Sequence, residues 1–204
     1  QAAKKSKICD EIFVTTDSKK IANIARKYGA TVPFLRQKKI SKSSTTTERT
    51  LQNALLDFEK YKKTKYDICI FLSCTNFFRR NGWISEAYNI LKNNKSIDSA
   101  FIVVKLYRHF WFIKDGKHKK VVSWMKNYHS RQTAPKLFRE ETGLACATRS
   151  KFWRKGKRIG KKVKLMVRND PFTGIDINNK DDLKIARIIF EYIKKNKLTK
   201  NIIV

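Results

Sequence analysis

Apolar and polar positions follow one another along the chain in a pattern that predicts strands and helices in turn. Short β-branched and apolar runs at Ile12–Thr16 and Val32–Leu35 predict two strands. The run Asp67–Ser73 has the length and continuity of a strand buried on both faces, as in a parallel sheet. Ser99–Lys105 predicts a further strand of the same kind.

Four segments carry apolar residues at the spacing of one helix face. The first is expected to begin after Asp17 or Ser18 and to end at Gly29, and the last to begin near Lys180. Their apolar positions are Ile21, Ile24, Ala25 and Tyr28; Leu51, Ala54, Leu55 and Phe58; Trp83, Ile84, Ala87, Ile90 and Leu91; and Leu183, Ala186, Ile189, Phe190 and Ile193.

Alternating strands and helices predict an α/β fold, in which a mainly parallel sheet carries helices on both faces. We expect one domain over residues 1–204, with ligands beyond the carboxyl ends of the strands. The alternation of predicted strands and helices stops between Tyr107 and Arg139, and this stretch is expected to form a protruding subdomain. Within it, two apolar segments around a turn predict a hairpin, and two more strands are expected after it: Phe110–Ile113, Asp115–Gly116 and Val121–Trp124, then Leu144–Thr148 and Val163–Val167.

Composition narrows the class of protein. Hydrophobic residues make up 41% of the 204 residues, which excludes disorder over most of the chain. No apolar run approaches the roughly 18 residues that span a membrane, so we expect a soluble protein without membrane partners. Four cysteines without zinc spacing indicate reduced core thiols and a cytoplasmic location. Gln1–Ser6 lacks both a starting Met and an apolar signal region, and is read as a cut or internal start.

The net charge of +30 is extreme and raises the question of nucleic acid as a partner. Lysines supply most of this charge, and their pairs are spread evenly from Lys4-Lys5 to Lys194-Lys195. Such lysine use, together with abundant Asn, Ile, Phe and Tyr, is also typical of an A/T-rich genome. Because no motif combines basic and aromatic residues, we expect nucleic-acid binding to be unlikely.

Three predicted strand ends are unusually polar, at Val14–Ser18, Leu72–Arg80 and Gly174–Leu183. The first two also fit ordinary strand-to-helix connections, one with a capping residue and one with surface arginines. In the third, Asp176 and Asn178 alternate along an extended segment, so that both oxygen-bearing side chains project to one face. That pair can hold a hard divalent cation, while Asn178 or Asn179 can equally cap the last helix.

The order of these motifs resembles the acylneuraminate cytidylyltransferases, the CMP-sialic acid synthetase family, over nearly the whole chain. The matching pieces are VTTDS at 14–18, VPFLR at 32–36, a Ser/Thr loop, LSCTNFFR at 72–79 for the family's LQPTSPLR, RQTAP at 131–135, and GIDI followed by DL at 174–183. This resemblance implies a Rossmann-like nucleotidyltransferase fold.

The resemblance also implies roles for single residues. Arg36 and Thr47 match nucleotide-binding positions, and Asp176 and Arg79 match catalytic ones. The substrate-binding positions are Ser73, Thr75, Arg131 and Gln132. Asp176 and Asn178 match the metal ligands, expected to bind Mg²⁺ or another divalent cation. The chain departs from the family where Ser73 replaces Gln, Ser43 replaces Asp and Asn178 replaces a second Asp.

The implied reaction activates a sialic acid-like nonulosonic acid with CTP, giving a CMP-sugar and pyrophosphate in a homodimeric enzyme. The family's first strand and its phosphate-binding loop have no counterpart after Gln1, so we expect the 204 residues alone to be incomplete and inactive. The alternative is a non-catalytic, degenerate or partner-completed homologue that acts as a binding module.

Overall fold

The structure is a computed structural model that describes residues 1–122, 127–130, 132–196, 198 and 202–203. Its helices, strands and one 3₁₀ turn follow the chain in this order: α1 Ala2–Ser6, α2 Lys19–Lys27, η1 Lys38–Ile40, α3 Thr47–Lys62, β1 Ile68–Phe71, β2 Arg79–Arg80, α4 Trp83–Asn93, β3 Ser99–Leu106, β4 Trp111–Lys114, β5 Lys117–Lys120, β6 Leu137–Glu140, β7 Cys146–Arg149, α5 Ser150–Arg154, β8 Val163–Arg168, α6 Lys180–Lys195 and β9 Ile202–Ile203.

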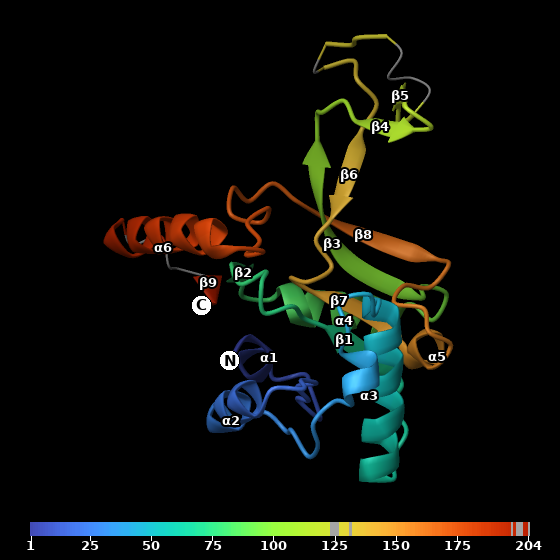
Figure 1. Cartoon of the computed structure of the whole chain (residues 1–204), viewed down its shortest axis with the longest axis vertical. Coiled ribbons are helices and arrows are strands. Elements are labelled where there is room, and N and C mark those ends of the chain that lie inside the picture. Colours follow the sequence, from blue (N-terminus) through green and yellow to red (C-terminus); the bar gives the residue numbers. More distant parts are fainter. Residues whose placement is uncertain (123–126, 131, 197, 199–201, 204) are drawn as a thin grey trace.

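The central sheet is organised around β3, the longest strand (Figure 1). On one edge β3 pairs in parallel with β8 from Ser99 to Val104. On the other edge, β7 pairs with residues 99–101 and β6 with residues 103–106, both antiparallel. β6 and β7 therefore lie end to end beside β3, and residues 141–145 separate them. β1 pairs with the other edge of β7.

The α/β class predicted from the sequence is correct, but the mainly parallel sheet is not what the structure contains. β1, β3 and β8 run in one direction, and β6 and β7 run in the other. The reason is the connection between β3 and β7. Parallel neighbours need a long crossover, usually a helix. Here the chain leaves along β3 and returns through β6 and β7 beside it, which makes the return antiparallel.

Helices cover both faces of this sheet, as expected. On one face α4 contributes Trp83, Ile84, Ala87 and Leu91 to a cluster with Ala100 and Ile102 of β3 and Met166 of β8. On the opposite face, Phe101, Val103 and Cys146 pack with Phe71 and Leu165, and α3 packs against β1 and α5. Successive β3 residues alternate between the two clusters, so both sheet faces are buried core.

Hydrogen bonds to the buried carboxylate of Glu59 hold α3 in place. Its carboxylate, 3% exposed, accepts hydrogen bonds from Arg154 of α5, from Lys65 and from the Tyr66 N–H. Burial alone raises the pKa of Glu59, but these hydrogen bonds outweigh it and lower the pKa from 4.5 to about 2. The charged network links α3 to α5 and to the residues that lead into β1.

The segments predicted as the first two strands do not form regular strands. Phe13 and Thr31 make an isolated parallel bridge, with the Val14 N–H bonded to the Thr31 carbonyl at 3.1 Å. α2 is capped by Ser18, and Gly29 follows with φ +83°, as predicted. The predicted apolar face of α2 is exposed, however, and within this helix only Ala22 is buried.

The stretch 107–139, here called the arm, leaves the sheet after β3, carries the β4–β5 hairpin away from it and rejoins it along β6 (Figure 1). Asp115 and Gly116 both have positive φ, which is the two-residue turn that suits a hairpin. Because of this turn, Lys114 of β4 lies opposite Lys117 of β5. The second strand of the hairpin therefore begins at Lys117, earlier than the predicted Val121–Trp124. Of that predicted strand, residues 123–124 lie outside the described residues.

Three of the predicted helices are present as α3, α4 and α6, while α1 and α5 were not predicted. α4 and α6 begin and end close to the expected positions, and α6 begins at Lys180. All four cysteines are free thiols, but Cys146 alone is fully buried and Cys74 is exposed. Within the described residues, no helix combines the length and apolar character needed to cross a bilayer.

Candidate functional site

Three segments that are distant in the sequence meet where β1 ends. They are the β1 loop (residues 72–78), the β6–β7 break (residues 141–145) and the β8–α6 loop (residues 169–179). The Ser73 N–H donates to the Gly143 carbonyl at 2.8 Å, which joins the first segment to the second. The Ile177 N–H donates to the Thr75 carbonyl at 3.2 Å, which joins the third segment to the first.

Gly143 allows this close approach. A Cβ at residue 143 would lie 1.9 Å from Asn76 Oδ1 and 2.8 Å from Ser73 Cβ. Because Asn76 is itself buried, it has little room to move aside. The β6–β7 break therefore needs glycine where it touches the β1 loop.

Arg79 ties the same two segments together from inside. Its side chain is buried, Nε donates to the Leu144 carbonyl at 2.8 Å, and Nη2 donates to the carbonyls of Gly143, at 2.7 Å, and Ser73. Burial lowers the pKa of the Arg79 guanidinium to about 10. Because its Nε and Nη2 atoms donate to backbone carbonyls, Arg79 holds the two segments in place, and the catalytic role expected from the sequence stays a prediction.

Two hydroxyls lie together on the β1 loop. Ser73 Oγ and Thr75 Oγ1 are 2.6 Å apart, and the Thr75 N–H donates to Ser73 Oγ at 3.2 Å. Both residues are half-buried. The two predicted substrate-binding hydroxyls are thus presented as one pair, within a loop whose backbone is held by Gly143 and Ile177.

Asp176 lies on the β8–α6 loop next to this pair. It is half-buried, and its Oδ1 atom is buried without a hydrogen-bond partner among the described residues. A buried carboxylate oxygen with no partner is costly, and such oxygens are usually satisfied by a ligand, a cation or water. The donor set of this site therefore fits a divalent cation at Asp176.

A second carboxylate, Glu141, lies near Asp176. Burial raises the pKa of Glu141, Arg139 opposes this increase, and the negative charge of Asp176 adds to it. Arg139 Nε donates to Glu141 Oε1 at 2.7 Å. The Arg139 guanidinium therefore lies directly against the Glu141 carboxylate at the start of the β6–β7 break.

Asn179 caps the last helix. Its side chain accepts hydrogen bonds from the N–H groups of Asp181 and Asp182, and the Asp182 carboxylate accepts from the N–H groups of Asn178 and Asn179. This reciprocal cap fixes the backbone that follows Asp176. Of the two asparagines considered for capping, Asn179 makes the bond, and the Asn178 side chain is exposed.

The other predicted site residues lie elsewhere. Arg36 Nε donates to Ser41 Oγ at 2.9 Å, and its Nη2 is 3.5 Å from Asp17 Oδ1. Thr47 is the exposed first residue of α3, behind the capping Thr46. Within the described part of the chain, no contact brings Arg36 or Thr47 to the three joined segments.

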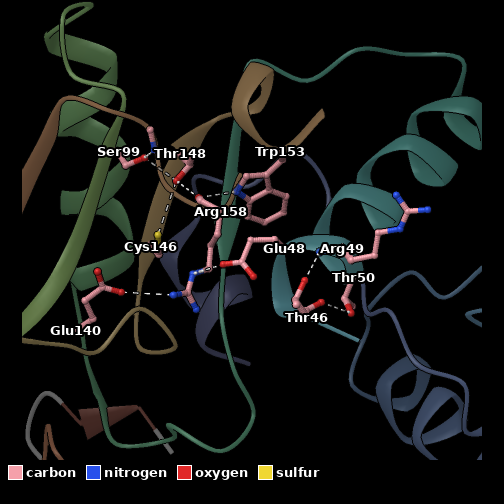
Figure 2. A network of polar contacts seen from close by, with 11 residues as sticks. Thr46, Glu48, Arg49, Thr50, Ser99, Glu140, Cys146, Thr148, Trp153 and Arg158 are labelled. Atoms are coloured by element: carbon pink, nitrogen blue, oxygen red, sulfur yellow. Dashed lines mark hydrogen bonds and ion pairs between the residues drawn. The ribbon is translucent and has the colours of Figure 1, made fainter. Parts of the chain in front are cut away.

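Arg158 links the start of α3 to the base of the arm (Figure 2). Its Nε is 3.8 Å from Glu48 Oε1 of α3, and its Nη2 is 3.4 Å from Glu140 Oε2 of β6. Figure 2 also shows the backbone of Arg158 held by Thr148 and Trp153, which donate to its carbonyl at 2.9 and 3.1 Å. This bridge places the helix that carries Thr47 near the strand that leads into Glu141.

Of the two predicted residues on the sugar-facing segment, Arg131 lies outside the described residues. Gln132 is exposed in a turn closed by the Thr133 N–H on the Ser130 carbonyl at 3.1 Å. A cavity of about 630 Å³ lies beside this turn, and its lining includes the basic side chains of Lys105, Arg108, His109 and His129. No group of three or more His, Cys, Asp and Glu side chains suited to a metal occurs in the described part of the chain.

Sequence reasoning missed Arg139, Glu141 and Gly143. A usable signal was present, because a strand-like run from Leu137 to Arg149 is interrupted by the polar Glu141-Thr142-Gly143. A glycine inside a strand pattern often marks a bulge or a close backbone approach. Here it marks the position where the strand breaks to form the site.

Comparison with known proteins agrees with this arrangement. The family described as cytidylyltransferase matches residues 1–199. Post-translational flagellin modification protein B of Campylobacter coli is 29% identical over 193 residues, which is 93% of this chain and 80% of that protein. CMP-N,N'-diacetyllegionaminic acid synthase of Campylobacter jejuni subsp. jejuni is 29% identical over 189 residues, 92% of this chain and 80% of that protein.

Among solved structures, CMP:2-keto-3-deoxy-manno-octonic acid synthetase complexed with CTP superimposes with a TM-score of 0.59 at 9% identity. The match covers 93% of this chain and 85% of the other. At this identity the likeness shows the fold alone, an α/β nucleotidyltransferase fold.

We expect Arg79→Lys to lower the free energy of unfolding by about 1–3 kcal/mol in urea denaturation. Lysine keeps the charge, but a single ammonium lacks the fork of donors that reaches the carbonyls of both joined segments. The matched control is Arg80→Lys, because Arg80 is half-buried and pairs with the carboxylate of Asp170, which an ammonium can also bind. Equal stability of the two variants would contradict the framework role of Arg79.

Proposed function

Because the chain belongs to the cytidylyltransferase family, the family of CMP-nonulosonic acid synthetases, we propose that it transfers CMP from CTP to a sialic acid-like nonulosonic acid and releases pyrophosphate. The observation that carries the proposal is Asp176 Oδ1, which is buried without a hydrogen-bond partner among the described residues. Its loop is joined to the loop that carries the paired hydroxyls of Ser73 and Thr75.

The reaction is a single displacement at phosphorus. The oxygen of the sugar acid's hydroxyl forms a bond to the α-phosphorus of CTP and gives up its proton to water. The bond from that phosphorus to the oxygen bridging to the β-phosphate breaks, and pyrophosphate leaves with the electron pair. Such a step depends on positioning and on charge stabilisation, and it needs no nucleophilic side chain.

Asp176 and Asn178 would hold the divalent cation, with the phosphates of CTP completing its shell. A carboxylate and a neutral amide oxygen form a small donor set, so the affinity of the free protein for Mg²⁺ is expected to be weak without the nucleotide. When bound, Mg²⁺ supplies neutralisation of the phosphate charge. The side chain of Asp176 fixes where that neutralisation occurs.

The remaining residues divide between the two substrates. Ser73 and Thr75 would hydrogen-bond the sugar acid, and the motif resemblance assigns Arg131 and Gln132 to the same substrate. The basic cavity beside Gln132 suits a carboxylate. Arg36 and Thr47 would bind the nucleotide, and this assignment rests on the motif resemblance. The use of CTP as substrate agrees with the cytoplasmic location expected from the sequence.

A homodimer is part of this proposal. The β4–β5 hairpin exposes large apolar side chains, among them Trp111 at 56% and Ile113 at 69%. A two-stranded hairpin is marginally stable unless it packs on a further surface. A second copy of the chain would supply that surface and bury the exposed side chains.

We expect pyrophosphate release from CTP, in the presence of a nonulosonic acid and Mg²⁺, from the full-length protein with any phosphate-binding loop that precedes Gln1, and Asp176→Asn to reduce this rate roughly 100-fold or more. The control is Asp181→Asn, because Asp181 is exposed and pairs with Lys184 on α6. Equal rates for the wild type and Asp176→Asn would remove Asp176 from the site. Binding of CTP without turnover of any nonulosonic acid would favour the non-catalytic alternative.

We expect sedimentation velocity to show a dimer whose dissociation constant rises about tenfold or more in Ile113→Asp, since a charge would replace an apolar contact in the interface. Ile188→Asp on α6 is the matched control, because Ile188 is 70% exposed, close to the value for Ile113. A monomeric wild type, or equal effects of the two variants, would contradict dimerisation through the hairpin.

A further inference from the structure

Arg139 connects the arm to the loop that carries Asp176. Its Nε and Nη2 atoms lie 2.7 and 2.6 Å from Glu141 Oε1, so the buried glutamate fixes the orientation of the guanidinium. Nη2 also donates to the Gly174 carbonyl at 3.3 Å. One side chain on β6 therefore contacts the β8–α6 loop two residues before Asp176.

The loop is shaped to receive this contact. A Cβ at residue 174 would lie 2.4 Å from Arg139 Nη2, so glycine leaves the space in which the guanidinium reaches the backbone. The other side of the loop is held by the Ile177 N–H on the Thr75 carbonyl. Asp176 thus lies between two anchors, Gly174 and Ile177, and the described contacts of its own side chain do not fix it.

We propose that Arg139 is a positioning residue for Asp176: the guanidinium, oriented by Glu141, holds the Gly174 carbonyl and so fixes the loop whose carboxylate binds the divalent cation. This inference rests on the proposed function, because it assumes that Asp176 binds a cation.

Charge and positioning predict opposite effects when Arg139 is removed. Taking a positive charge away from a cation site reduces repulsion and, by Coulomb attraction alone, tightens cation binding. Releasing the loop that carries the ligand weakens binding, and removal of a residue that orients a metal ligand typically costs 10–100-fold in affinity. The sign of the change therefore separates the two effects.

The experiment measures Mn²⁺ binding in the presence of CTP by electron paramagnetic resonance, with Mn²⁺ as the probe. Arg139→Met should weaken Mn²⁺ binding roughly 10–100-fold. Since this variant leaves Glu141 buried without its partner, the double variant Arg139→Met/Glu141→Gln, which removes one charge of each sign, should show the same loss. In both variants, hydrogen exchange of the amides at 174–177 should become faster without any ligand.

Arg168→Ala is the matched control. Arg139 on β6 and Arg168 on β8 flank the same β3 residue, Val104, and each pairs with a glutamate, Glu86 in the case of Arg168. Arg168→Ala therefore removes an arginine from the same row of the sheet but no hydrogen bond to the β8–α6 loop. It should leave both Mn²⁺ binding and hydrogen exchange at residues 174–177 unchanged.

Tighter or unchanged Mn²⁺ binding in both Arg139 variants, while Asp176→Asn weakens it, would overturn the positioning role and leave the proposed function intact. Equal weakening by Arg168→Ala would also overturn it, as a general charge effect. If the wild type binds Mn²⁺ no better than Asp176→Asn does, the cation site of the proposed function fails, and this inference fails with it.

Discussion

A buried guanidinium without a carboxylate partner among the described residues is the constraint on which the site depends. Burying the charge of Arg79 is costly, and the carbonyls of Ser73, Gly143 and Leu144 offset that cost only while all three lie in place. The end of β1 and the β6–β7 break are thereby held together across more than 60 residues of sequence. Because carbonyls are present at every position, the frame does not depend on which side chains the β1 loop carries. Ser73 can stand where the resembled family has Gln without disturbing the frame.

The path of the chain explains why the arm and the site are connected through β6. β3 leads out to the arm, and β6 brings the chain back along the same edge. The return strand breaks at residues 141–145 where it passes the end of β1, and this break presents Glu141 and Gly143 to the neighbouring loops. Arg139 lies on β6, two residues before the break begins, and its side chain donates to the Gly174 carbonyl on the loop of Asp176. The base of the arm is therefore part of the wall of the site.

Local patterns predicted the elements that depend on local physics. The capping residues and apolar spacing placed α6 at Lys180, and Asp115-Gly116 predicted the hairpin turn. Strand direction was not predictable in this way, since alternation indicates which face a residue takes but not which way β7 runs. The resemblance assigns Ser73, Thr75 and Asp176 to one site, and the structure joins the loops that carry them through the Ile177 N–H on the Thr75 carbonyl. The resemblance gave no reason to expect Arg79 on backbone carbonyls. Glu141 and Arg139 were missed because their importance comes from the hydrogen bonds that link Glu141 to Arg139 and Arg139 to the Gly174 carbonyl, which no local pattern records.

In the proposed function, the three joined segments together bind the phosphates of CTP, the cation and the sugar acid. Hydrogen exchange with and without CTP and Mg²⁺ tests it most directly, because every segment is followed in the same sample. The account predicts that amides in residues 72–78, 141–145 and 173–178 gain protection together, with the same dependence on CTP concentration. Protection confined to one of these segments, or appearing only outside them, would contradict the account.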